Sequence, residues 1–78
     1  MKLTDQQTEE LRALAKAPQR TYGRHRARVQ RNLAALGLAA FANEDGTPWK
    51  HGLEPGADLC VITDRGRAEA SQLGSEGT

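Results

Sequence analysis

RVQRNLAALGLAAF (residues 28–41) and DLCVITDRGRAEA (residues 58–70) carry most of the information about the fold. In the first stretch, leucines at helical spacing are followed by Gly37 and then by small apolar residues, which predicts a helix that ends at the glycine and turns directly into a strand. In the second stretch, the apolar residues 59–62 predict a strand, and Thr63 can cap a helix that follows. Together they predict a helix, a two-stranded hairpin and a closing helix.

A first helix is predicted over residues 5–16. Thr4 and Gln7 have the spacing of a capping box, and Lys16 falls in the last turn, where a cation is favoured. Pro18 prevents the helix from continuing. The buried stripe of this helix is predicted to consist of Leu11, Leu14 and Ala15.

A second helix is predicted from Tyr22 or Gly23 to Leu36, with Thr21 as its N-cap and Gly37 as the left-handed residue that ends it. A period of 3.6 residues places apolar side chains on one face and basic side chains on the other. The apolar face contains Tyr22, Val29, Leu33 and Leu36, and the basic face contains Arg24, Arg28 and Arg31. Tyr22 is expected to pack between the first two helices.

The remaining elements follow from local patterns. Residues 38–42 are predicted as a strand with Leu38, Ala40 and Ala42 facing one way, and residues 43–56 as a loop rich in turn-forming residues. The return strand covers residues 59–62, and a short C-terminal helix follows up to residue 73. The sequence therefore predicts one α+β domain over residues 1–73 and a disordered tail over residues 74–78.

The segments LAALGLA and ITDRGRAEA resemble the end of the recognition helix, the wing and the closing helix of winged-helix proteins, including repressors of the multiple-antibiotic-resistance type and other small bacterial and phage regulators. The matching positions are Leu33, Leu36, Gly37, Leu38, Ile62, Thr63, Gly66, Arg67 and Ala68. This resemblance implies that the helix before the wing enters the major groove of DNA and that the wing touches the adjacent backbone.

The chain departs from this family before the second helix. The family has two helices in a helix-turn-helix, whereas the residues between Pro18 and Gly37 suffice for one good helix and a turn. Either the first helix of the pair is reduced to the turn around residues 19–23, or one long helix is broken in two.

The sequence favours a non-enzymatic protein without cofactor or metal. No Ser–His–Asp or Cys–His arrangement, paired carboxylates or phosphate-binding glycine loop is recognisable. Cys60 is the single cysteine, which excludes an internal disulfide, and its place within LCVI predicts a small buried side chain. No apolar run is long enough to cross a membrane and no signal peptide is recognisable, so we expect a cytoplasmic protein that binds no membrane.

The net charge of +1 conceals a strong separation of charge. Residues 11–43 contain many basic side chains and no carboxylate, because every Asp and Glu lies outside this range. The basic residues of this range are Arg12, Lys16, Arg20, Arg24, Arg26, Arg28 and Arg31. Such a block indicates an anionic partner.

The sequence predicts double-stranded DNA as this partner. Arginine can pair bidentately with phosphate or with the O6 and N7 atoms of guanine. The predicted DNA-binding residues are Arg24, Arg28 and Arg31 on the helix face, Arg20 and Arg26 at its flanks, and Lys50 in the wing. Gln30 and Asn32, to either side of this face, could read an adenine edge. Since one small module contacts few base pairs, specificity would need a homodimer or a tandem site, with the first or last helix as the contact.

Two other functions stay open at the level of sequence. The arginine face could bind an acidic protein, in which case the domain would be a protein-interaction module. The wing loop favours this alternative because it is acidic, with Glu44, Asp45, Glu54 and Asp58. RNA binding is disfavoured, because the aromatic platforms that stack unpaired bases are missing.

Two side chains outside the arginine face also allow alternative interpretations. Trp49 in the wing is predicted to anchor the loop, with contact to a partner as the alternative. His25 is predicted to be a partly buried structural residue rather than a pH switch.

Overall fold

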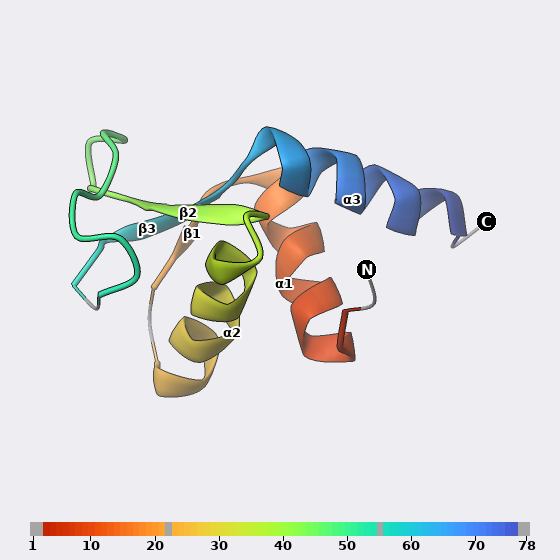
Figure 1. Ribbon diagram of the computed structural model, residues 1–78, viewed down its shortest axis with the longest axis horizontal. Helices are drawn as coiled ribbons and strands as arrows, with labels where there is room; N and C mark the ends of the chain where they lie inside the picture. The colour runs from red at the N-terminus through yellow and green to blue at the C-terminus, as the bar shows by residue number, and fades with distance from the viewer. Residues whose placement is uncertain (1–2, 22, 55, 77–78) are drawn as a thin grey trace.

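Within the residues that the structure describes, 3–21, 23–54 and 56–76, three helices pack against one three-stranded antiparallel sheet (Figure 1). In this computed structural model the elements are α1 (Asp5–Lys16), β1 (Gln19–Arg20), α2 (Arg24–Ala35), β2 (Ala39–Ala42), β3 (Leu59–Ile62) and α3 (Asp64–Glu76). The predicted α+β class and the order of helix, hairpin and closing helix are confirmed.

The sheet contains one strand that the sequence analysis missed. Its order is β1-β3-β2, and Cys60 of β3 pairs with Gln19 of β1 on one side and with Phe41 of β2 on the other. The segment around β1 was predicted as a connection because two residues are too few to show a period. Their strand conformation depends on pairing with β3, far along the chain. α2 is one unbroken helix, so of the two alternatives for residues 18–37 the structure excludes a long helix broken in two.

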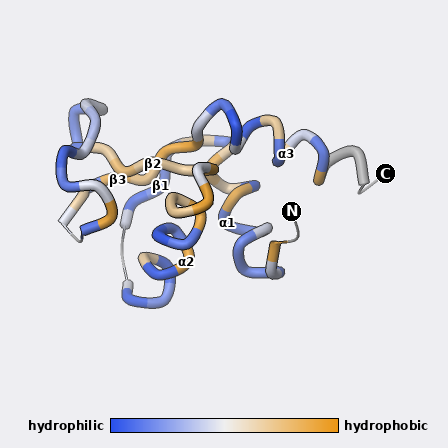
Figure 2. The backbone as a smooth tube through the Cα atoms, in the orientation of Figure 1, coloured by the Kyte–Doolittle hydropathy of each residue, from blue (hydrophilic) through white to orange (hydrophobic). Residues whose placement is uncertain are grey.

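The hydrophobic core lies between the helices and the face of the sheet that carries Cys60. It consists of Leu11, Leu14, Leu33, Leu38, Ala39 and Cys60, all buried. Figure 2 shows hydrophobic colour along β2 and β3, and hydrophilic colour along the β2–β3 loop and the first turn of α2. This small aliphatic core agrees with the three aromatic residues of the whole sequence, one each of Trp, Tyr and Phe.

The bounds of α1 are those predicted. The Thr4 hydroxyl accepts a hydrogen bond from the Gln7 N–H at 3.1 Å, and the Gln7 side-chain oxygen accepts one from the Thr4 N–H at 2.9 Å. This reciprocal capping box fixes the start of the helix. The backbone is extended at Ala17, just before Pro18, where the helix ends.

The ends of α2 differ in how well the sequence predicted them. Thr21 is not the N-cap: its hydroxyl donates to the Ala57 carbonyl, and Gly23, with a φ of 78°, occupies the cap position without a side-chain bond. The C-terminal prediction is confirmed, since Gly37 has a φ of 80°. The N–H groups of Gly37 and Leu38 donate to Ala34 and Leu33 in the pattern of a Schellman motif.

The strand that was predicted over residues 38–42 is shorter in the structure. Leu38 lies before β2 and closes the Schellman motif. Within β2, Ala40 and Ala42 alternate onto one face, as predicted, and Ala39 and Phe41 share the other face, which carries the core. Both ends of β2 are buried, at Ala39 and Ala42.

The junction between β3 and α3 ties the end of α2 to the start of α3. The Thr63 hydroxyl accepts from the Gly66 N–H at 3.0 Å, as the predicted cap, and also donates to the Gly37 carbonyl at 2.7 Å. Gly66 lies so close to β2 that an added Cβ would collide with the Leu38 carbonyl oxygen and lie 2.7 Å from Cγ1 of Ile62. α3 then continues to Glu76, beyond the predicted end at residue 73; residues 77–78 of the predicted tail lie outside the described residues.

Gly66→Ala is therefore expected to destabilise the fold. In an unobstructed helix this change would stabilise by about 1 kcal/mol, but here backbone atoms must move, with an expected net loss of about 1–3 kcal/mol. Denaturant titration checks the sign, with the exposed Gln72→Ala in the same helix as control. A Gly66→Ala variant as stable as the unmodified protein would contradict this packing.

Cys60 is expected to resist thiol reagents in the folded protein. Burial raises the pKa of its thiol from an ordinary 9.0 to about 12, so little thiolate forms at neutral pH. Because the folded-state pKa is the higher one, the associated stability is complete below about pH 9 and is lost as the pH rises toward 12.

A thiol-specific chromogenic reagent at pH 8 measures this protection. In Ala68→Cys, the exposed new thiol should react rapidly and Cys60 only after denaturation. Equal reactivity of both thiols in the folded state would show that Cys60 is accessible.

Candidate nucleic-acid interface

Three of the predicted arginines form one exposed face of α2, which we call the arginine face: Arg24, Arg28 and Arg31. The helix buries Val29, Gln30 and Leu33 against the rest of the protein, and at 100° per residue the arginine face lies opposite to them. In the part of the chain that the structure describes, no hydrogen bond or ion pair engages these three side chains. Their charges are therefore available to an external anion.

The arginine face borders a shallow open depression at the start of α2. Thr21, Gly23 and Ala27 line it together with the three arginines. The first turn of α2 contains no acidic residue, and no side chain caps it. The positive end of the helix dipole thus adds to the arginine charges, and an approaching phosphate would be favoured by both.

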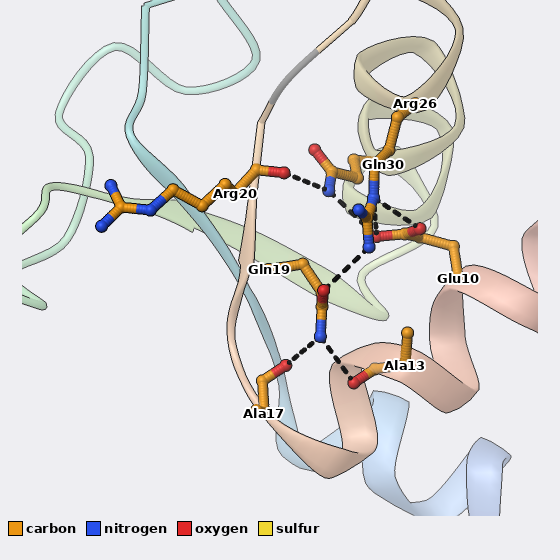
Figure 3. Close-up of polar contacts among 7 residues, drawn as sticks. All are labelled: Glu10, Ala13, Ala17, Gln19, Arg20, Arg26 and Gln30. Atoms are coloured by element: carbon orange, nitrogen blue, oxygen red, sulfur yellow. Dashed lines mark hydrogen bonds and ion pairs between the residues drawn. The ribbon is translucent and has the colours of Figure 1, made fainter.

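Arg26 does not belong to this surface. It points toward α1, where its Nε donates to the Glu10 carboxylate at 3.0 and 3.2 Å, and a terminal nitrogen donates to Oε1 of Gln19 at 2.8 Å (Figure 3). The Glu10 side chain is 10% exposed and that of Arg26 40%. This arginine therefore serves an internal ion pair, in contrast to the predicted phosphate contact.

Gln30 takes part in the same cluster and cannot read a base. It is fully buried, and its side-chain nitrogen donates to Glu10 at 2.9 Å and to the Arg20 carbonyl at 3.3 Å. The spacing contained a signal for this: positions 26, 29, 30 and 33 have the i, i+3, i+4, i+7 spacing of one helix face. Because Arg26 and Gln30 are polar, this buried face was not recognised in the sequence. In α1, Glu10 likewise shares the buried face with Leu11 and Leu14.

Arg20 lies apart from the arginine face. Its side chain points away from Gln19, Gln30 and Arg26, as expected for the residue next to Gln19 in a strand (Figure 3). It pairs with Glu44 at 3.2 Å, and both side chains are largely exposed, at 48% and 69%. An exposed pair of this kind contributes between about 0 and 1 kcal/mol.

Lys50 is exposed in the β2–β3 loop, and its neighbour Trp49 organises this loop. Trp49 donates its backbone N–H to Phe41 and its indole N–H to the Glu54 carbonyl at 3.2 Å, and its ring meets that of His51 edge-on at 4.8 Å. The predicted anchoring role of Trp49 is thereby confirmed.

The prediction for His25 is wrong, and that for Tyr22 lies outside the described residues. His25 is exposed rather than partly buried. It lines a groove between α1 and α2 together with Glu9 and Arg26.

A small pocket of about 80 Å³ lies between α2 and the β2–β3 loop. Ala27, Phe41, Leu53 and Ala57 supply apolar lining, and Arg31 lies among its polar neighbours. Sites for drug-sized ligands usually measure about 300–1,000 Å³, so this pocket is smaller than such a site.

Among residues 3–21, 23–54 and 56–76, no three His, Cys, Asp or Glu side chains lie together as metal ligands would. No helix in the same ranges has the length and apolar character needed to cross a bilayer.

Comparison of this chain with models of protein families, with curated proteins and with solved structures finds no match.

Substitutions in the arginine face and substitution of Arg26 should differ in their effect on the stability of the fold. Arg24→Ala, Arg28→Ala and Arg31→Ala each remove an exposed charge, so the free energy of unfolding should change by less than about 0.5 kcal/mol. Arg26→Ala leaves the Glu10 carboxylate without its cation and should cost about 1–3 kcal/mol, less than for a fully buried pair because Arg26 is partly solvated. Urea titration of the four variants compares them, and an Arg26→Ala cost as small as the others would show that the pair is not stabilising.

Proposed function

We propose that this chain is a non-enzymatic, cytoplasmic double-stranded-DNA-binding protein of winged-helix type, acting as a bacterial or phage transcription regulator. The observation that carries the proposal is the arginine face: three exposed arginines that have no carboxylate partner among the described residues, on the side of α2 opposite the core. The order of helix, strand, helix, hairpin and helix supports the resemblance to winged-helix proteins.

The dimensions of α2 suit the major groove. An α-helix with side chains is about 10–12 Å wide, and the groove is about 12 Å wide. Arg24 and Arg31 are separated by seven residues, hence about 10 Å along the axis, which corresponds to about three base pairs. One copy would therefore read few base pairs, and a homodimer or a tandem site would supply the rest of the specificity.

The charge of the β2–β3 loop makes α2 the main surface for the proposed DNA contact. Its carboxylates Glu44, Asp45, Glu54 and Asp58 are exposed. The hydroxyl and backbone N–H of Thr47 donate to Asp45 and hold its pKa below the ordinary value, so this group stays ionised. Lys50 is the cation that this loop could offer to a phosphate.

The acidic loop also supports a second candidate, a protein-interaction module. In that function the arginine face would bind an acidic protein surface, and the loop would not be repelled by a partner with basic residues at its rim. The salt-series experiment described next separates the two functions.

Binding of a fluorescent random-sequence duplex, followed by anisotropy over a salt series, tests the proposed DNA binding. The logarithm of affinity should fall linearly with the logarithm of salt concentration, and each of Arg24→Ala, Arg28→Ala and Arg31→Ala should make the slope shallower by about 0.9 if that arginine contacts a phosphate. Arg12→Ala is the matched control, because it removes one exposed arginine from α1 and should leave the slope unchanged.

If the triple variant of the arginine face binds with unchanged affinity and slope, the proposed DNA interface is wrong. If the unmodified protein binds no duplex even at low salt, the protein-interaction module becomes the better assignment.

A further inference from the structure

We propose that Arg26 is a positioning residue for DNA binding, acting through a cluster with Glu10, Gln19 and Gln30 that fixes the rotation of α2 about its axis. We call these four residues the polar clamp. The inference rests on the proposed function and deepens it, because it assigns different roles to arginines of one helix. The arginine face contacts the DNA, and Arg26 holds α2 in position.

The polar clamp joins three elements that are separate in the chain. From α2, Arg26 and Gln30 both donate to the Glu10 carboxylate of α1, and Arg26 also reaches Gln19 of β1 (Figure 3). Gln19 in turn donates to the carbonyls of Ala13 at 3.1 Å and Ala17 at 3.0 Å, at the end of α1. The side chains of α2 are thus tied directly to the middle of α1, at Glu10, and through Gln19 to the end of α1.

Hydrogen bonds restrict rotation more strongly than the apolar contacts beside them. The apolar contacts of α2 come from Val29 and Leu33, and the hydrophobic effect that favours their burial is non-directional. A rotation of about 20° moves a side-chain head about 6 Å from the axis by about 2 Å. That displacement breaks a hydrogen bond of 2.9 Å, such as the one between Gln30 and Glu10.

The same rotation would displace the arginine face. Its side chains lie opposite to the polar clamp, so they swing by a comparable distance in the opposite direction. Bidentate pairing of arginine with a guanine edge depends on a planar fork geometry, whereas attraction to phosphate depends mainly on charge. The polar clamp should therefore govern the preference among DNA sequences and leave the salt dependence of binding unaffected.

The burial of the polar clamp explains why it can hold this orientation. Gln30 is fully buried and Glu10 nearly so, which strengthens their hydrogen bonds to one another. Oε1 of Gln30 accepts no hydrogen bond among the described residues. If the amide were reversed, its oxygen would face the Glu10 carboxylate, so the amide orientation is also determined by this carboxylate.

The double variant Glu10→Met/Arg26→Met provides the main test. It removes one charge of each sign, keeps the net charge, and replaces a partly buried pair by apolar side chains, which proteins often tolerate. We expect the salt slope for a random-sequence duplex to match that of the unmodified protein. The ratio of affinities between the duplex best selected by the unmodified protein and a random duplex should fall about tenfold.

Arg26→Lys provides a second test, in which the charge is kept but the fork is lost. Lysine cannot serve Glu10 and Gln19 with the same geometry, so sequence preference should fall with the salt slope unchanged. Arg28→Ala is the contrasting variant, since it should reduce the slope by about 0.9. If Glu10→Met/Arg26→Met instead reduces the slope by about 0.9 and keeps the sequence preference, Arg26 is a phosphate ligand and the inference is overturned while the proposed function stands.

A measurement without DNA separates failure of the inference from failure of the proposed function. Residual dipolar couplings of backbone amides report the orientation of α2 relative to α1. In the double variant we expect the couplings of α2 to shrink or to fit a rotated axis frame, with those within α1 unchanged. Should the unmodified protein bind no duplex, this measurement still decides the matter: unchanged couplings in α2 would overturn the positioning role.

Discussion

The contact between the start of α3 and the end of α2 is the constraint on which the rest of the fold depends. The Thr63 hydroxyl bridges the Gly37 carbonyl and the Gly66 N–H, and Gly66 allows the two backbones to approach closely. This junction closes the hairpin at the end remote from its loop. It also places β3 in the middle of the sheet, where Cys60 completes the core, and leaves α2 with one face against α1 and the other toward solvent.

The sequence predicted those features that depend on neighbouring residues. The capping box of Thr4 and the positive φ of Gly37 are local, and they gave the bounds of α1 and the end of α2. The arginine face followed from the helical period alone. β1 and the polar clamp could not be predicted in this way, because each joins residues from distant elements. Thr21 was misjudged for the same reason, since the Ala57 carbonyl competes for its hydroxyl.

The six predicted DNA-binding residues illustrate how one residue type serves different purposes. Arg24, Arg28 and Arg31 share one exposed surface, whereas Arg26 lies about half a turn around the helix and faces α1. Arg20 pairs with Glu44 on another side of the molecule, and Lys50 lies in the loop. Charge counting could not distinguish these positions; for the four arginines of α2, the phase of each residue relative to Val29 and Leu33 does.

The two-residue strand β1 has a consequence for aggregation of the chain, because it covers one edge of β3. β3 reads LCVI, an uncharged and partly β-branched sequence of the kind that pairs readily with other chains when an edge is open. β2 covers one edge of it, and on the other edge β1 covers Leu59 and Cys60. β1 itself offers neighbouring molecules a charged Arg20, and it follows Pro18, which has no N–H to donate. The two residues of β1 thus protect β3 from edge-to-edge aggregation. How often this edge of β3 is exposed depends on the stability of the pairing between β1 and β3.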